Sequence, residues 1–269
     1  MDDSNGKRTM NAAATADRLY ILDGGTARVN DASIYSPGES VGKPMTLSCN
    51  AYLIRHRAHW MLWDTGTQDD LIDIPEGRVI AHDIHGSVSR TIVSQLEEIG
   101  VSPDEIDTLA ISHAHYDHVG NCRLFRNAKW IAQKDEYDAM FGDDPAAYGF
   151  DPSLYCSLLG NPIEMIDGDH DVFGDGAVRI VATPGHTPGH SSLLVNLPET
   201  GTVLLSGDVA HTRRNFRCRC VPVFNADSLR SIASMEKVDA LLEAEGATLW
   251  VNHDIVQNGS LPHAPMSIR

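Results

Sequence analysis

Positive charge is scarce in this sequence, and long apolar runs are missing. Its 269 residues include 21 Lys and Arg against 37 Asp and Glu, which gives a formal net charge of -16. An acidic chain of this kind is poorly suited to binding nucleic-acid phosphates or anionic membranes, so neither partner is expected. No run of 18 apolar residues occurs, which argues against a membrane-spanning helix. Residues 1–17 lack the apolar core of a secretory signal and are expected to form a disordered lead.

Cysteine is also scarce. The five cysteines are an odd number and are scattered along the chain: Cys49, Cys122, Cys156, Cys218 and Cys220. This usage favours free thiols in a reducing cytoplasm over a disulfide framework, so a cytoplasmic protein is expected. Cys218 and Cys220 flank a single residue, which is too short a spacing for a typical zinc knuckle.

Strand-like apolar runs dominate the sequence and are separated by Gly, Pro and Asn turns. The predicted strands are 18–23, 47–55, 59–66, 106–112, 129–133, 177–183, 190–196, 202–208 and 247–254. Helices are predicted at 88–100 and 227–246, each ended by a glycine, with a polar loop at 67–87 and an irregular cap at 141–162. Two runs of strands with flanking helices predict one α/β domain over 18–269, built from two face-to-face sheets with helices outside.

The densest group of chemically active side chains lies in residues 111–121, ISHAHYDHVGN. His113, His115, Asp117 and His118 fall within six positions, directly after a predicted apolar strand. His113 and His115 are two residues apart, so in an extended segment both side chains face the same side. A single histidine is most often an ordinary surface group, but four metal-binding side chains in six positions favour a metal site.

Further candidate ligands stand at the ends of later predicted strands. His186 and His190 lie in the turn TPGHTPGH, Asp208 ends the run LLSGD, and His253 follows LWVN. Because each residue stands where the chain leaves the core, the side chains can converge on one edge of the sheets. Imidazole and carboxylate donors without thiolate suit zinc, with manganese, iron and cobalt as alternatives.

At these residues the chain resembles the metallo-β-lactamase fold hydrolases. The likeness rests on the pattern H-x-H-x-D-H at 113–118, on the later His186, Asp208 and His253, and on Asp64 in a DTG turn. It extends from residue 18 to about residue 255. The resemblance implies an αββα sandwich of two mixed sheets, with two metal ions at one end.

The same resemblance implies a complete ligand set. One metal would be held by His113, His115 and His186, the other by Asp117, His118 and His253, and Asp208 would bridge them. The family pattern makes neither His190 nor Asp64 a ligand. His190 is expected to be a supporting histidine, and Asp64 is expected to orient an imidazole.

Two such metals can share one water and lower its pKa, so a bridging hydroxide is the expected nucleophile. Asp117 or Asp208 is expected to carry a proton to the leaving group. Within the family, the chain looks most like the N-acyl-homoserine-lactone lactonases, because of its length, its late NHD motif and the segment after Asp208. The resemblance therefore implies opening of a small lactone ring. Those lactonases usually carry a tyrosine where this chain has His211, which makes His211 a further catalytic candidate.

Other reactions of the same fold stay open. A glyoxalase II-like thioesterase would use the same metals, but it usually adds a basic C-terminal patch, and the tail QNGSLPHAPMSIR has a single Arg. A secreted β-lactamase would need a signal peptide, and a persulfide dioxygenase does not need the second ligand set. A homodimer is compatible with the sequence but is not indicated by it.

Substrate contacts are less clearly marked than the ligands. Several ring-bearing side chains are candidates to line a pocket: Tyr116, His82, His85, Phe141, Tyr148, Phe150 and Phe216. A basic cluster in an otherwise acidic chain consists of Arg213, Arg214, Arg217 and Arg219. This cluster is either a solvated, salt-bridged surface or a site that binds a substrate carboxylate in a bidentate manner.

Overall fold

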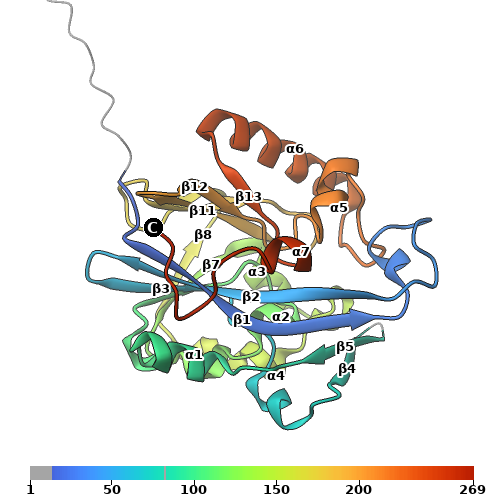
Figure 1. Ribbon diagram of the computed structural model, residues 1–269, viewed down its shortest axis with the longest axis horizontal. Helices are drawn as coiled ribbons and strands as arrows, with labels where there is room; N and C mark the ends of the chain where they lie inside the picture. Colours follow the sequence, from blue (N-terminus) through green and yellow to red (C-terminus); the bar gives the residue numbers. More distant parts are fainter. Residues whose placement is uncertain (1–13, 82) are drawn as a thin grey trace, which may run out of the picture.

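The computed structural model describes residues 14–81 and 83–269, and these form two stacked sheets with helices on both outer faces (Figure 1). Within the described residues, the larger sheet has eight strands in the order β4-β5-β1-β2-β3-β6-β7-β8. Their bounds are β1 Arg18–Val29, β2 Met45–His56, β3 His59–Trp63, β4 Arg78–Ala81, β5 Ile84–Ser87, β6 Thr108–Ala110, β7 Lys129–Gln133 and β8 Ile163–Ile166.

The smaller sheet has five strands over the same described part of the chain, in the order β13-β12-β11-β10-β9. Their bounds are β9 His170–Asp171, β10 Val178–Ala182, β11 Ser191–Leu197, β12 Gly201–Leu205 and β13 Thr248–Trp250. The helices are α1 Ile92–Ile99, α2 Tyr116–Val119, α3 Lys134–Met140, α4 Pro152–Tyr155, α5 Arg213–Cys218, α6 Ser228–Glu245 and α7 Ile255–Asn258. No helix in the described ranges is both long enough and apolar enough to cross a bilayer.

The layering follows from the alternation of side chains along the strands. In β1, Leu19 and Ile21 enter the core between the sheets, whereas Tyr20 and Leu22 enter the core beneath α1, α3 and α4. This period of two is the geometry of any strand that is buried on both faces. On the smaller sheet, Leu194 turns outward to the core that α6 covers. The predicted sandwich of two mixed sheets with helices outside is therefore confirmed.

Local sequence signals set the ends of the two predicted helices. Asp227 caps α6 by accepting hydrogen bonds from two backbone N–H groups of its first turn, and Gly246 ends it with φ of 61°. Thr91 caps α1 by accepting one hydrogen bond, from the N–H of Ser94, and Gly100 ends the helix with φ of 84°. Both helices lie inside the predicted ranges.

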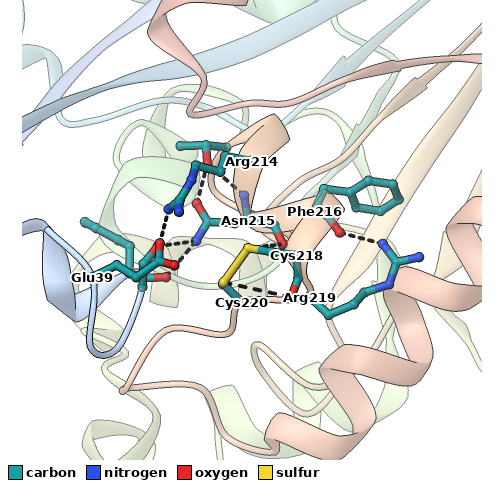
Figure 2. Close-up of a disulfide and its surroundings, with 10 residues drawn as sticks. Glu39, Arg214, Asn215, Phe216, Cys218, Arg219 and Cys220 are labelled. Atoms are coloured by element: carbon teal, nitrogen blue, oxygen red, sulfur yellow. Dashed lines mark hydrogen bonds and ion pairs between the residues drawn. A yellow bond between two sulfur atoms is a disulfide. The ribbon is translucent and has the colours of Figure 1, made fainter.

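Two expectations from the sequence are wrong. The polar stretch 67–87 is not only a loop, because it contains the hairpin β4–β5, whose second strand pairs with β1. The cysteines are not all free thiols, because Cys218 and Cys220 form a disulfide (Figure 2). The residue between them, Arg219, has φ of 54°, and this turn brings the two Cα atoms to 5.3 Å.

The predicted disordered lead lies mostly outside the described residues. Its last residues, 14–17, pack against the domain. Ala16 is fully buried and donates its N–H to the carbonyl of Asn196. The described fold thus includes residues before β1.

In both sheets, parallel strands end at the same edge. Strands β3 and β6 run parallel, and so do β12 and β13, so that each pair ends on the same side. The segments that follow these strands contain Asp64, His113, Asp208 and His253. The predicted convergence of His113, Asp208 and His253 therefore has a simple basis in strand direction.

A glycine holds one of these segments in place. Gly120 follows α2 and donates its N–H to the carbonyl of Gly66 at 2.9 Å. A Cβ atom at this position would lie 2.4 Å from the backbone nitrogen of Gln68 and 2.6 Å from the carbonyl oxygen of Gly66. Since both contacts are to backbone, neither can be relieved by a side-chain rotation.

We therefore expect Gly120→Ala to lower the free energy of unfolding by about 1–3 kcal/mol or more, the usual cost of overpacking. Denaturant unfolding measures the change. The control is Gly160→Ala, because a Cβ at Gly160 meets nothing within 4 Å. Equal unfolding midpoints for the two variants would show that the contact at Gly120 is not restrictive.

Candidate metal centre

One short segment supplies four of the predicted ligands. After β6 the chain places His113 and His115 on a bend, and His115 is the N-cap residue of the one-turn helix α2. This helix carries Asp117 and His118 on its inner side, where both are buried. The change from extended chain to helix lets side chains within six residues face two different points.

The first point is surrounded by three imidazoles. Nδ1 of His115 lies 2.9 Å from Nε2 of His113 and 2.9 Å from Nε2 of His186. Oδ2 of Asp208 lies 3.3 Å from Nε2 of His186 and 3.7 Å from Nε2 of His113. One donor atom from each of these four residues lies within 4.8 Å of the others.

The second point adjoins the first through Asp208. Its Oδ1 lies 3.3 Å from Nε2 of His118 and 2.9 Å from Nε2 of His253. Asp117 completes this side, with carboxylate oxygens 3.8 Å from Nε2 of His118 and 3.7 Å from Nε2 of His253. The structure thus brings all seven predicted ligands together around the carboxylate of Asp208.

Hydrogen bonds on the outer side of three rings determine which nitrogen carries the proton. Nε2 of His115 lies 2.9 Å from the carbonyl oxygen of Tyr148, and Nδ1 of His253 lies 2.6 Å from that of Ser48. Nδ1 of His186 lies 2.9 Å from Oδ1 of Asn225. Because these oxygens only accept hydrogen bonds, each facing nitrogen must donate. The opposite nitrogen of each neutral ring then presents a lone pair to the centre.

Ser112 and Asp64 impose the same arrangement on the other two rings. Asp64 accepts hydrogen bonds from Oγ of Ser112 and from Nδ1 of His118, both at 2.9 Å. Since the Ser112 hydroxyl donates to Asp64, its oxygen accepts from Nδ1 of His113 at 3.0 Å. Asp64 holds this position with φ of 60°, which is unusual for a residue other than glycine. The carboxylate is engaged on the outer side of these rings, where an orienting role is expected.

In their neutral forms, five imidazoles therefore turn lone pairs toward one another and toward a carboxylate. Nε2 of His118 and Oδ1 of Asp208 are buried without a hydrogen-bond partner among the described residues. Burial lowers the pKa of His113 and of His186 well below the usual value, which keeps both rings neutral. Burial would also lower the pKa of His118 and of His253, but the charge of Asp208 raises the first well above its usual value and the second to about 9, so these two rings hold protons when no metal ion is bound. This space favours positive charge, and the donors present fit metal cations.

His190 supports Asp208 from behind. Its Nδ1 lies 2.9 Å from the carbonyl oxygen of Thr183, so its Nε2 accepts the backbone N–H of Asp208 at 2.7 Å. Burial lowers the pKa of His190 to about 4, which keeps the ring neutral. His190 therefore has no nitrogen left for a metal, which agrees with its expected supporting role.

A cavity of about 280 Å³ opens onto this cluster. Apolar and aromatic side chains form most of its wall: Ala27, Tyr35, Leu47, Ile84, Tyr116, Ala146, Ala147, Tyr148 and Phe224. Its polar floor consists of His115, Asp117, Asp208, His211 and His253. Neither Lys nor Arg is among the described residues that line it, so the cavity suits a small molecule without a strong negative charge.

His211 lies against the bridging carboxylate. Its Nε2 is 3.2 Å from Oδ2 of Asp208, and its ring stacks on that of His253 with centroids 5.2 Å apart. On the other side, the ring of Tyr35 packs against His211 at 4.7 Å. Tyr35 is buried, and no hydrogen bond to its hydroxyl is found within the described residues. Nδ1 of His211 also lacks a hydrogen-bond partner among the described residues, so each of these two side chains keeps a polar atom that is available to a ligand.

The structure places the other residues that were predicted to line a pocket in different locations. Tyr116 and Tyr148 line the cavity, whereas Phe141 and Phe216 pack into apolar clusters. Phe150 is buried against the ring of His115, His85 lies on β5, and His82 falls outside the described residues. The arginines Arg213, Arg214 and Arg219 form ion pairs with Asp254, Glu39 and Asp239, so the surface interpretation of the basic cluster holds for them.

Sequence reasoning missed four residues that complete the site. Tyr35 enters the cavity from a distant loop, the thiol of Cys49 donates to Asp117 at 3.4 Å, and Asn225 orients His186. Glu136 is buried and accepts hydrogen bonds from the N–H of Ala114 and of Gly189 and from the hydroxyl of Thr187. The sequence did carry one signal for Glu136, because an acidic residue stands there on the apolar face of a helix. It carried no such signal for Tyr35, Cys49 or Asn225.

The geometry of the cluster agrees with what known proteins show. A profile described as "Metallo-beta-lactamase superfamily" matches residues 45–247. The chain belongs to the metallo-beta-lactamase superfamily. Within this superfamily, it is similar to the N-acyl homoserine lactonase AttM of Azorhizobium caulinodans, with 31% identity over 248 residues, 88% of this chain and 93% of that protein.

Two other members of the superfamily are similar over nearly the whole chain. The N-acyl homoserine lactonase AiiA of Bacillus thuringiensis subsp. kurstaki is 29% identical over 252 residues, 91% of this chain and 96% of that protein. A solved structure of an N-acyl homoserine lactone hydrolase, with the product N-hexanoyl-L-homoserine bound at the catalytic metal center, superposes with a TM-score of 0.81. That structure is 28% identical and covers 95% of this chain and 100% of its own.

Glu136 provides a test of how the ligand loops are held. Its carboxylate joins the segment of His113 and His115 to that of His186, and burial raises its pKa to about 7. We expect Glu136→Ala to release both loops and to weaken metal retention by about 10–100-fold, as loss of an orienting partner commonly does. Competition with a chelator measures the change. The control is Glu97→Ala on the exposed face of α1, and equal resistance of both variants to the chelator would contradict the prediction.

Proposed function

We propose that the cluster binds two metal ions. His113, His115 and His186 would hold one, Asp117, His118 and His253 would hold the other, and Asp208 would contribute an oxygen to each. The support is that the outer hydrogen bonds aim five imidazole lone pairs inward, while the two oxygens of Asp208 face different groups. Zinc suits imidazole and carboxylate donors, and manganese, iron or cobalt would accept the same set.

Metal ions bound there would supply Lewis acidity toward a carbonyl oxygen and would lower the pKa of a bound water. The protein's own residues then have three tasks, which are to admit the substrate, to orient its carbonyl and to move a proton. The apolar wall of the cavity performs the first task. Asp117 and Asp208 stand on the floor, where either carboxylate can pass a proton to the leaving oxygen.

We propose that the substrate is a small lactone, such as an N-acyl-homoserine lactone, and that the reaction is hydrolytic ring opening. The observation that carries this proposal is an apolar cavity with neither Lys nor Arg among its described lining residues, directly above a cluster of side chains that could hold metal ions. An acyl-homoserine lactone is uncharged and partly apolar, so it matches such a cavity. The similar proteins bear the name N-acyl homoserine lactonase, which points in the same direction.

Tyr35 and His211 would orient the substrate carbonyl. In related lactonases a tyrosine usually follows the bridging aspartate, whereas His211 stands here and its Nε2 faces Asp208. The hydroxyl of Tyr35 comes from another loop, and its ring packs on His211. We propose that this phenol donates a hydrogen bond to the carbonyl oxygen, while His211 holds the phenol and the carboxylate of Asp208 in place.

A panel of substrates tests the reaction class. We expect ring opening of N-acyl-homoserine lactones, with one proton released per turnover and detected by a pH indicator. Other lactones, S-lactoylglutathione and a β-lactam serve as alternatives. S-lactoylglutathione carries charged carboxylates, and no Lys or Arg among the described lining residues faces them. Turnover of S-lactoylglutathione alone would replace the lactonase proposal with a thioesterase.

Two substitutions separate the tasks of Tyr35 and His211. Tyr35→Phe removes only the hydroxyl, so we expect turnover to fall by about 10²-fold, a loss typical of one oxyanion donor. His211→Ala removes the ring that supports both neighbours, so turnover should also fall. Elemental analysis should find the metal content of both variants unchanged. Wild-type kinetics in Tyr35→Phe would exclude the phenol from the reaction.

A further inference from the structure

A continuous segment of the chain carries both the centre and a disulfide. Asp208 and His211 lie at its start, and α5 follows at once. The helix ends at Cys218, and the disulfide to Cys220 closes the turn that follows it (Figure 2). The segment then returns to the cavity. It reaches the cavity wall at Phe224, and the next residue orients His186.

Hydrogen bonds join the turn that the disulfide closes to α5, and join α5 to the loop that carries Tyr35. The N–H of Cys220 donates to the carbonyl of Asn215 at 3.0 Å. The side-chain amide of Asn215 donates to the carbonyl of Tyr35 and to the hydroxyl of Ser36, both at 2.8 Å. A few residues on, the N–H of Val223 donates to the carbonyl of Ile34 at 2.9 Å. The segment is therefore joined on both sides of the disulfide to the loop that carries Tyr35.

The disulfide is open to solvent, and arginines lie beside it in the sequence. Cys218 is exposed and Cys220 is partly exposed. Arg214 and Arg219 are paired with Glu39 and Asp239, whereas Arg217 has no ion pair among the described residues. Arginine beside a cysteine stabilises the thiolate, which is the form that takes part in thiol–disulfide exchange, and it attracts anionic thiols.

The protein holds its other cysteines differently. Cys49 and Cys122 are buried, and burial raises the pKa of both thiols. Cys156 is exposed but has no partner cysteine within the described residues. Among the five cysteines, the pair at 218 and 220 therefore combines exposure, a second sulfur within bonding range and arginine neighbours.

We propose that Cys218 and Cys220 form a reversible redox site, which exchanges with small anionic thiols and adjusts the substrate cavity. A thiolate of glutathione attacks the sulfur of Cys218, the bond to Cys220 breaks, and Cys220 leaves as a thiolate that takes a proton from water. A second glutathione thiolate then attacks the mixed disulfide, releases oxidised glutathione and leaves Cys218 as a thiolate that is likewise protonated. Two glutathione molecules are oxidised for each disulfide that is reduced.

Reduction removes the covalent closure of the turn. Arg219 has φ of 54°, a conformation that side chains other than glycine rarely adopt, and without the disulfide the turn loses a constraint that holds it there. The hydrogen bonds that carry Asn215 and Val223 to the loop of Tyr35 then weaken. In reducing surroundings, the cavity wall that contains Tyr35 therefore becomes more mobile.

The test uses the whole protein in glutathione buffers that are either oxidising or reducing. Alkylation and mass spectrometry should find the pair blocked in the first buffer and both thiols labelled in the second. Hydrogen exchange should then be faster in peptides covering 213–226 and 32–36, and unchanged in α1. With the lactone substrate, KM should rise about fivefold and kcat stay within twofold, as expected when pocket contacts weaken.

Two variants act as controls. The double variant Cys218→Ser and Cys220→Ser should show the faster hydrogen exchange and the raised KM in both buffers. Cys156→Ser should respond to the buffers as the wild type does. The labelling and exchange measurements need no substrate, so a failure of the lactonase proposal would leave them valid. Free thiols at both positions in the oxidising buffer would overturn the redox site. A disulfide that forms without any change of exchange at 32–36 would overturn its coupling to the cavity.

Discussion

The two oxygens of Asp208 form the point on which the rest of the site depends. Imidazoles face both oxygens, with Nε2 of His186 3.3 Å from Oδ2 and Nε2 of His118 3.3 Å from Oδ1. Each of the five candidate ligand rings has its outer nitrogen in a hydrogen bond: His113, His115, His118, His186 and His253. Lone pairs brought this close repel one another and repel the carboxylate unless a cation lies between them. The fold therefore maintains an arrangement that is unfavourable alone and favourable once positive charge is bound.

Residues from both sheets supply the hydrogen bonds that hold these rings and the carboxylate in place. Asp64 and Ser112 belong to segments after strands of the larger sheet, and they hold His113 and His118. His190 and Asn225 act from the side of the smaller sheet on Asp208 and His186. Because partners on one sheet orient ligands that face those of the other, the relative position of the two sheets sets the geometry of the centre. A change in the packing between the sheets is therefore also a change in the site.

The layers and the candidate metal-binding residues could be predicted from spacing along a strand or across a turn, whereas the division of these residues between two metals was implied only by the family resemblance. His113 and His115 follow one strand at an interval of two, and Asp208 and His253 end runs that are plainly apolar. Tyr35 and Glu136 could not be predicted in this way, since they reach the site from segments whose position is set by tertiary packing. The disulfide was missed for a related reason. It depends on a left-handed backbone at Arg219, where no glycine marks the turn.

The order of the ligands along the chain has a consequence for biosynthesis. His113, His115, Asp117 and His118 leave the ribosome as one short peptide, while His253 emerges only when most of the protein has been made. An early metal ion can therefore meet the first ligands before the smaller sheet exists to supply Asp208. The proposed ligand set is complete only after the two sheets have docked. Insertion of two metal ions at this cluster would therefore follow assembly of the two halves of the domain.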